Sequence, residues 1–147
     1  MNRALVLAEW ARAKQSLRAA EILAREECAE DAIFRAYYAT LHAAKAALLV
    51  HEVVVESHAA VKRMFGLHLI RPGEIEAQWS DHLGGSLDDR LSADYDTDAF
   101  FSTDEAQEEC RQTRRFLNRI RRYLLAKGFT QKELRQERPV DESGHRV

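Results

Sequence analysis

Apolar residues recur at alternating steps of four and three along most of the chain, and this spacing restricts the fold more than any other feature. In residues 3–26 the stripe consists of Val6, Trp10, Ala13, Leu17, Ala20 and Ala24. Such steps place every member on one face of an α-helix, whereas a half-buried strand needs an apolar residue at every second position. Alternation of period two is scarce, and residues 53–55 are the only strand-like run. The chain is therefore predicted to be all-α.

Three more helices are predicted before the C-terminal part of the chain. Residues 30–50 are almost wholly apolar, so we expect a helix that is buried on most sides. Ser57 is a suitable N-cap for a short helix through about residue 69. A fourth helix is expected over about residues 74–93. The pair Gly84-Gly85 in its middle predicts a kink or break, because two glycines cost roughly 2 kcal/mol of helix propensity.

The last predicted helix has the clearest boundary signals. Ser102 and Glu105 are spaced as a capping box at its start. Phe101 and Ala106 are placed as a hydrophobic staple, and Gly128 as the C-cap. Acidic residues crowd the first turns and six arginines the later ones, in the order that complements the helix dipole. We expect these arginines to form a solvated face, with contact to RNA phosphate as the alternative.

These signals divide the chain into two parts. Residues 1–128 are predicted to form a five-helix, up-and-down bundle whose core comes mainly from the first, second and last helices. Residues 129–147 are predicted to be a polar, flexible tail, with Phe129 folding back onto the last helix. The 147 residues suffice for one domain with a sizeable core.

The charge and the cysteines exclude several classes of protein. Lys and Arg total 22 against 24 Asp and Glu, so a generally cationic protein that coats DNA is not expected, although a local basic patch remains open. Cys28 and Cys110 make neither a metal cluster nor a disulfide framework, so no metal or other cofactor is expected. No run approaches the ~18 apolar residues of a membrane span. Free thiols and the absence of a signal peptide lead us to expect a cytoplasmic protein.

One predicted helix carries a polar stripe. Its members are Asp31, Arg35, Tyr38, His42 and Lys45, which step by four and three and therefore share one helix face. An arginine binds phosphate, a tyrosine stacks on a base, and a histidine transfers a proton near neutral pH. Two structural alternatives remain open. Asp31 and Arg35 are also spaced as an ordinary helical ion pair, and a single histidine on a helix usually has a structural role.

The same helix resembles a known family. Residues 35–49, which read RAYYATLHAAKAALL, resemble the signature helix of the HEPN superfamily, and in particular its small stand-alone prokaryotic group. The pair Ser57-His58 with Phe65, residues 90–96, and the pair Phe100-Phe101 before an acidic-to-basic helix resemble further motifs of that group. The resemblance covers about residues 5–125. It implies a bundle that forms a two-fold dimer. It also implies frequent genetic pairing with a minimal nucleotidyltransferase, often as a toxin–antitoxin pair.

The resemblance also implies a metal-independent endoribonuclease with an Arg-x6-His motif at Arg35 and His42. Arg35 would hold the phosphate and stabilise its charge, and His42 would transfer protons. Tyr38 and Lys45 would bind RNA or a nucleotide. One histidine cannot readily be base and acid at once, so a two-fold dimer would supply the second.

An alternative function belongs to a different class, a non-catalytic nucleotide-binding or partner-binding subunit of a minimal nucleotidyltransferase. The chain has Ala36 where the strongest HEPN nucleases place a polar residue, and Ala44 where the toxin subgroup has a tyrosine. The nuclease requires Arg35 and His42 to line an open cleft at the dimer axis. The binding subunit tolerates Arg35 buried in a salt bridge with Asp31 or Asp94.

Overall fold

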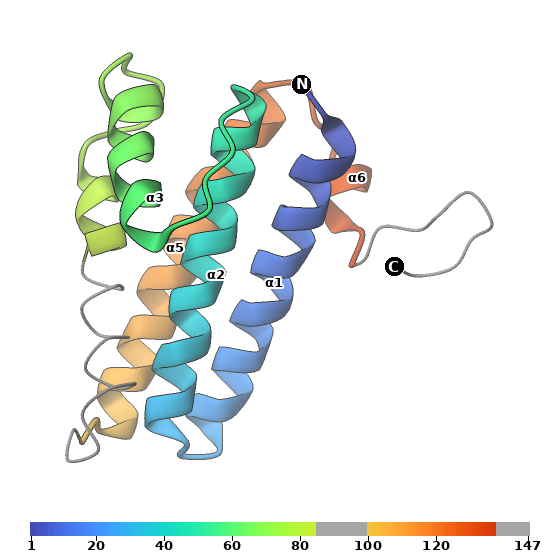
Figure 1. Cartoon of the computed structure of the whole chain (residues 1–147). Coiled ribbons are helices and arrows are strands. Elements are labelled where there is room, and N and C mark those ends of the chain that lie inside the picture. The colour runs from blue at the N-terminus through green and yellow to red at the C-terminus, as the bar shows by residue number, and fades with distance from the viewer. Residues whose placement is uncertain (85–99, 138–147) are drawn as a thin grey trace.

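Three long helices lie side by side and form the body of the molecule (Figure 1). They are α1 (Arg3–Arg25), α2 (Ala29–Val50) and α5 (Thr103–Ala126), and each contacts the other two. A computed structural model of the chain describes residues 1–84 and 100–137. The all-α prediction is confirmed, and every described secondary-structure element is helical. Among the described residues, no helix has both the length and the apolar character needed to cross a membrane.

The first two helices follow the predicted pattern closely. The Asn2 side chain caps α1 by accepting a hydrogen bond from the Leu5 N–H, and the predicted apolar stripe of α1 is buried. α2 presents mainly alanines to its neighbours, and Ala39 and Ala43 are fully buried. Such small side chains allow α1 and α5 to approach α2 closely. The turn between α1 and α2 contains Glu27 at a φ of 62°. This left-handed conformation usually favours glycine, and here a glutamate adopts it.

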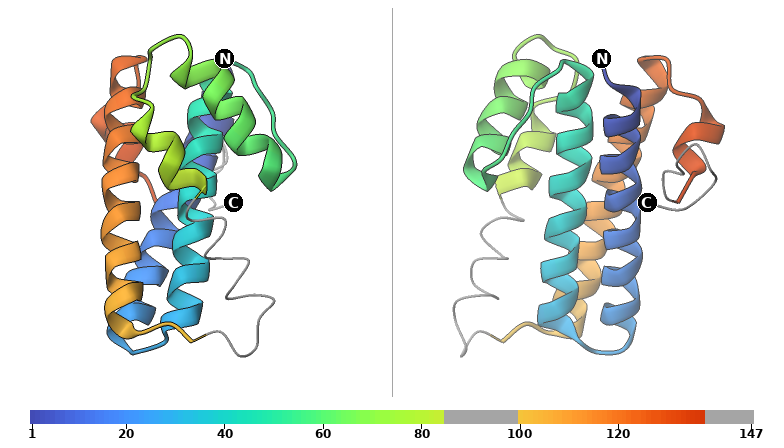
Figure 2. Two further views of the ribbon diagram at one scale, coloured as in Figure 1. Left: turned by 90° about the vertical axis from the view of Figure 1, so that its left-hand side faces the viewer. Right: turned by 45° about the vertical axis from the view of Figure 1, so that its right-hand side comes forward.

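A smaller helical layer covers one side of the long helices, while the C-terminal segment lies on the opposite side (Figure 2). The layer begins with α3 (His58–Phe65), whose N-cap Ser57 accepts a hydrogen bond from the Ala60 N–H, as predicted. The helix continues as η1 (Gly66–Ile70), a π-helical turn. The fully buried Phe65 and Leu69 anchor this layer in the core.

The predicted helix over residues 74–93 begins only at residue 78. Residues 71–77 instead form a turn in which Gly73 adopts a φ of 80°, and Arg119 of α5 binds the Glu76 carboxylate through N–O distances of 2.8 and 3.0 Å. This attachment holds the segment away from helical geometry. Helical structure is described through residue 84, so the break predicted at Gly84-Gly85 and the motif at residues 90–96 lie outside the described residues.

A cluster of titratable side chains fixes the same turn to the end of α5. The Glu74 carboxylate accepts hydrogen bonds from the Tyr123 hydroxyl at 2.8 Å and from Lys127 Nζ at 2.5 Å, and lies 2.6 Å from His51 Nε2. Burial opposes ionisation of Glu74, but the hydrogen bonds from Lys127, Tyr123 and His51 outweigh it and lower its pKa to about 2. The cluster therefore has a structural role, because it attaches the turn at Glu74 to the end of α5.

The last long helix begins and ends where the sequence predicted. The Ser102 side chain accepts from the Glu105 N–H at 3.1 Å, which is one half of the predicted capping box. Phe101 packs against the cluster that contains the buried Ala106. Gly128 follows the helix at a φ of 98°, a conformation that favours glycine.

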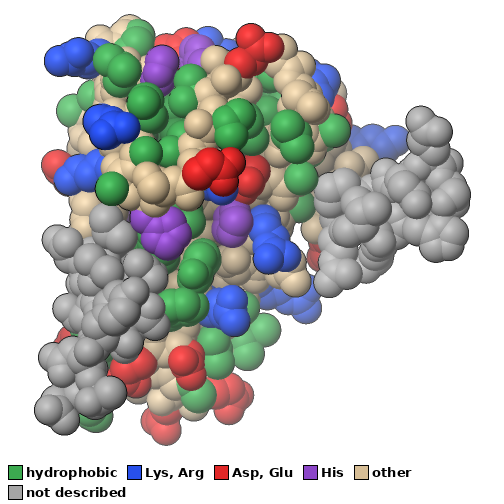
Figure 3. Space-filling model, in the orientation of Figure 1, with side chains coloured by type: hydrophobic (Ala, Val, Ile, Leu, Met, Phe, Trp, Pro, Cys, Tyr) green, Lys and Arg blue, Asp and Glu red, His purple; other side chains and the backbone are tan. Residues whose placement is uncertain are grey.

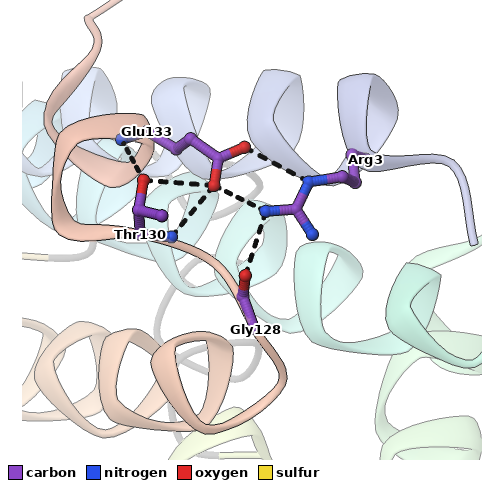
Figure 4. Close-up of polar contacts among 4 residues, drawn as sticks. All are labelled: Arg3, Gly128, Thr130 and Glu133. Carbon is purple, nitrogen blue, oxygen red and sulfur yellow. Dashed lines mark hydrogen bonds and ion pairs between the residues drawn. The ribbon is translucent and has the colours of Figure 1, made fainter.

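The segment after Gly128 differs from the flexible tail that we expected. The buried Phe129 agrees with its predicted return to the last helix. The difference begins with α6 (Gln131–Arg135), which starts with a full capping box between Thr130 and Glu133. Arg3 of α1 binds Glu133 with two N–O contacts of 2.5 and 3.2 Å and donates to the Gly128 carbonyl at 3.1 Å (Figure 4). The buried Leu134 adds an apolar anchor. Residues 129–137 thus pack against α1, and residues 138–147 lie outside the described part of the chain.

Candidate active site

An open groove of about 570 Å³ lies between α1 and α2. The wall from α2 consists of Phe34, Arg35, Tyr38 and His42, and the wall from α1 consists of Arg12, Gln15, Ser16 and Ala19. The α2 residues share one helix face because successive members lie three or four positions apart. The structure therefore brings three of the four predicted site residues together.

His42 is held by a carboxylate from α1. Its Nδ1 lies 2.6 Å from Glu9 Oε2, and the two side chains are only 19% and 23% exposed. A carboxylate accepts hydrogen bonds, so we assign the proton of this contact to Nδ1. In the neutral ring, Nε2 is then the nitrogen that accepts a proton. The contact fixes both the position of the ring and its tautomer.

Lys45, the fourth predicted site residue, does not line the groove. Its Nζ lies 3.6 Å from Glu9 Oε1, so Glu9 sits between Lys45 and His42. Burial would raise the pKa of Glu9, but the hydrogen bond from His42 and the charges of His42 and Lys45 lower it below the ordinary value. Glu9 is therefore ionised near neutral pH. Lys45 supports this charge from outside the groove.

Arg35 is exposed at the opening of the groove. Its guanidinium carbon lies 5.9 Å from the centre of the Phe34 ring. Among the residues that the structure describes, Arg35 has no carboxylate partner, and the helical ion pair with Asp31 is not formed. Asp94, the other carboxylate considered for this arginine, lies outside those residues. Within the described part of the chain, Arg35 thus lines the open groove and forms no buried salt bridge.

Aromatic rings form one wall of the groove. Phe34 meets Tyr38 edge to face, with 4.9 Å between ring centres, and the Tyr38 and His42 rings are stacked at 6.3 Å with an angle of 28°. Tyr38 is half-buried, and the buried Tyr37 supports it from the core side at 5.4 Å. Such a row of rings is a surface on which a nucleic-acid base can stack.

The sequence pattern did not single out Phe34, the groove residues of α1, or Glu9, which holds His42 from outside the groove. Glu9, Arg12, Ser16 and Ala19 step by three and four, so a helical wheel places them beside the apolar stripe of α1. That signal was available. It does not tell which of several polar stripes on α1 faces the α2 site, because this depends on how the two helices pack.

Comparison with known proteins shows the family of the chain. The family model of the HEPN domain matches residues 7–123, which include every residue of the groove. "Putative toxin MJ0605" of Methanocaldococcus jannaschii is 38% identical over 112 residues, or 76% of this chain and 83% of that protein. "Putative toxin MJ0142" of the same organism is 30% identical over 83% of each chain. "UPF0332 protein glr0978" of Gloeobacter violaceus is 32% identical over 77% of this chain and 90% of its own length. The chain therefore belongs to the HEPN domain family, as its α2 motif predicted.

Proposed function

We propose that the protein is a metal-independent endoribonuclease of a toxin-type HEPN system, with Arg35 and His42 acting on the RNA backbone. One observation carries the proposal. Arg35 and His42 line the same open groove, where Arg35 has no carboxylate partner among the described residues and Glu9 holds His42. The names of two relatives, "Putative toxin MJ0605" and "Putative toxin MJ0142", support the same biological class.

The reaction that fits these groups is internal transesterification of RNA. The 2′-oxygen forms a bond to the adjacent phosphorus while the bond from phosphorus to the 5′-oxygen breaks, leaving a 2′,3′-cyclic phosphate and a 5′-hydroxyl. A base takes the proton of the 2′-hydroxyl, and an acid gives a proton to the leaving oxygen. His42 Nε2 is suited to either transfer, and Arg35 binds the phosphate and stabilises its developing charge.

Glu9 has a positioning role in this scheme. It fixes the imidazole tautomer and stabilises the positive charge that His42 carries after taking up a proton. Phe34 and Tyr38 hold a base beside the scissile phosphate by stacking. A single imidazole performs one proton transfer at a time, so the proposal includes a two-fold dimer in which His42 of a second copy performs the other.

A second candidate function rests on a different observation. Ala36 and Ala44 are both fully buried, so neither position offers the polar or aromatic group that the nuclease subgroups present there. In this alternative the groove holds a nucleotide by stacking on Tyr38 and by contact with Arg35, without reaction. The protein would then be the binding subunit of a minimal nucleotidyltransferase.

The two functions are separated by RNA cleavage in the presence of EDTA. The substrate is a mixed pool of tRNA and mRNA, and the proteins are the wild type, His42→Ala and the control His68→Ala, which changes a histidine of η1 that does not line the groove. We expect cleavage by the wild type and the control, with 2′,3′-cyclic phosphate ends, and loss of cleavage in His42→Ala. A folded wild-type dimer that cleaves nothing refutes the nuclease and leaves the binding subunit.

A further inference from the structure

A second cavity opens on the neighbouring face of α1, between α1, α5 and the C-terminal segment. It has a volume of about 490 Å³, and we call it the α6 pocket. Its floor includes Trp10 and Leu134, both almost fully buried. The indole N–H of Trp10 donates to the Leu134 carbonyl at 3.1 Å, so the ring is already engaged in packing. The pocket therefore exposes no broad aromatic face, unlike the groove at His42.

The walls of the α6 pocket are basic. They carry Lys14, Arg18, Arg121 and Arg135, against one carboxylate, Glu137. This excess of positive charge stands out in a chain whose net charge is −2. It is the local basic patch that the overall composition left open, and it lies beside the segment that the sequence assigned to a flexible tail.

Most of this charge is not neutralised within the protein. Arg18 makes only a loose contact of 3.9 Å with Glu137, and both side chains are about three-quarters exposed. Arg121 and Arg135 have no carboxylate partner among the residues described. Lys14 is different, because its ammonium group donates to the carbonyls of Leu134 and Gln136 at 2.5 and 2.8 Å. Three guanidinium groups thus remain to bind an anion.

The α6 pocket adjoins the groove that contains Arg35 and His42. Gln15 lines both cavities, and Arg12 on the groove side lies six residues from Arg18 on the pocket side, or about 9 Å along the axis of α1. Basic side chains gather on the face of the molecule over the middle of α1 (Figure 3). A path of positive charge therefore crosses α1 from one cavity to the other.

We propose that the α6 pocket binds backbone phosphates of the same single-stranded RNA whose scissile phosphate enters the groove, with the strand crossing α1 at Gln15. The inference rests on the proposed function and adds a second subsite to it. Guanidinium groups bind phosphate through paired hydrogen bonds, and without an exposed aromatic ring the pocket offers no surface on which a base can stack. The subsite therefore strengthens binding of longer RNA irrespective of its sequence.

The test compares two double variants that remove the same charge. The pocket variant combines Arg121→Gln and Arg135→Gln. The control variant combines Arg122→Gln and Lys132→Gln, at exposed residues of the same two helices that lie one and three positions away and do not line the pocket. Binding is measured by fluorescence anisotropy over a range of salt concentrations. The probes are a dinucleotide and a 2′-O-methyl RNA of about ten nucleotides, within the usual size of single-strand sites. The 2′-O-methyl group blocks cleavage.

We expect the pocket variant to bind the longer RNA about tenfold more weakly, because two exposed charge contacts are lost. The slope of log affinity against log salt becomes shallower by about 1.4, or about 0.7 for each phosphate contact. The pocket variant binds the dinucleotide as tightly as the wild type does. The control variant changes the affinity for the longer RNA and its salt dependence far less. Arg18→Gln, at an exposed side chain whose loss cannot unfold α1, gives a smaller change in the same direction.

Other outcomes overturn the inference in distinguishable ways. Equal losses in the pocket and control variants show that the effect is general charge and not a subsite. If inorganic phosphate displaces the RNA from the pocket and the affinity does not depend on RNA length, the pocket is a site for a free anion. RNA binding that depends on Arg35 but not on the pocket refutes the subsite and retains the proposed function. Pocket-dependent RNA binding without any cleavage, and without an effect of Arg35→Gln, refutes the proposed function instead.

Discussion

Replacing Glu9 by glutamine removes the negative charge that faces His42 and preserves the shape of the side chain. Oε2 of Glu9 lies 2.6 Å from Nδ1 of His42 in a site where both side chains are mostly buried. A glutamine amide oxygen still accepts the Nδ1 proton, so the ring keeps its orientation and tautomer. The substitution therefore isolates the effect of the charge on a histidine that becomes positive during the proposed reaction.

The size of the effect follows from the kind of hydrogen bond that is lost. A hydrogen bond to a charged group contributes about 1.5–3 kcal/mol and a neutral one about 0.5–1.5 kcal/mol, so the change costs about 1–2 kcal/mol. In the copy of His42 that acts as the base, the positive charge develops as the reaction proceeds, so the loss falls on the transition state. This corresponds to about a five- to thirtyfold lower kcat. KM stays unchanged, since Glu9 does not line the groove.

Initial rates on a fluorogenic RNA, measured near neutral pH over a range of substrate concentrations, separate kcat from KM. The control is Glu21→Gln, which changes a glutamate of the same helix that pairs with Arg114 and does not line the groove. Thermal melting shows that both variants are folded. A kcat of Glu9→Gln equal to that of the wild type, or a loss confined to KM, refutes the positioning role of Glu9.

Two further predictions concern stability. Glu74→Gln lowers the free energy of unfolding near neutral pH by about 1–2 kcal/mol. The full difference between a pKa of 4.5 and about 2 corresponds to about 3 kcal/mol, and solvent around the partly exposed carboxylate reduces this contribution. Because the pKa of Glu74 is lower in the folded state, this stabilisation is present above about pH 4.5 and is lost as the pH falls toward 2. Denaturant titrations of the wild type and Glu74→Gln therefore converge in acid. The control Glu56→Gln matches the wild type throughout. Leu134→Ala lowers the stability by about 2 kcal/mol or more in the same assay, since a buried leucine is truncated. The exposed neighbour Lys132→Ala changes it by less than about 0.5 kcal/mol, and a neutral Leu134→Ala contradicts the idea that α6 stabilises the bundle.

Features of the fold that depend on neighbours along the chain were predictable. Ser57, Ser102 and Gly128 mark helix ends because a cap contacts residues within one turn. The stripe Arg35, Tyr38, His42 shares one face because helical periodicity alone determines it. The predicted helix bounds placed a break between residues 26 and 30, but the conformation of the turn at Glu27 and the late start of the helix at residue 78 were not predictable in this way. The first uses a left-handed glutamate, and the second depends on Arg119, which lies more than forty residues away from Glu76.

The C-terminal segment shows why polarity alone misleads. Residues 129–137 contain few apolar side chains, and composition therefore favours a solvated tail. Leu134 is nevertheless buried against the rest of the bundle, as is Phe129, which was expected to fold back onto the last helix. The capping box at Thr130 follows the S/T-x-x-E pattern, which can be recognised in the sequence. The ion pair between Glu133 and Arg3, at the opposite end of the chain, cannot be recognised in this way.

The sequence by itself determined that the chain is helical, where most helices begin and end, that α2 carries Arg35 and His42 on one face, and that the chain resembles the HEPN family. Each of these properties is encoded within a few turns of helix or in a contiguous motif. Only the tertiary structure decided that Glu9 holds His42, that Lys45 lies outside the groove, and that α6 completes a basic pocket beside it. These contacts join residues that are 33 or more positions apart, and they depend on the relative rotation and position of packed helices, which no local pattern specifies.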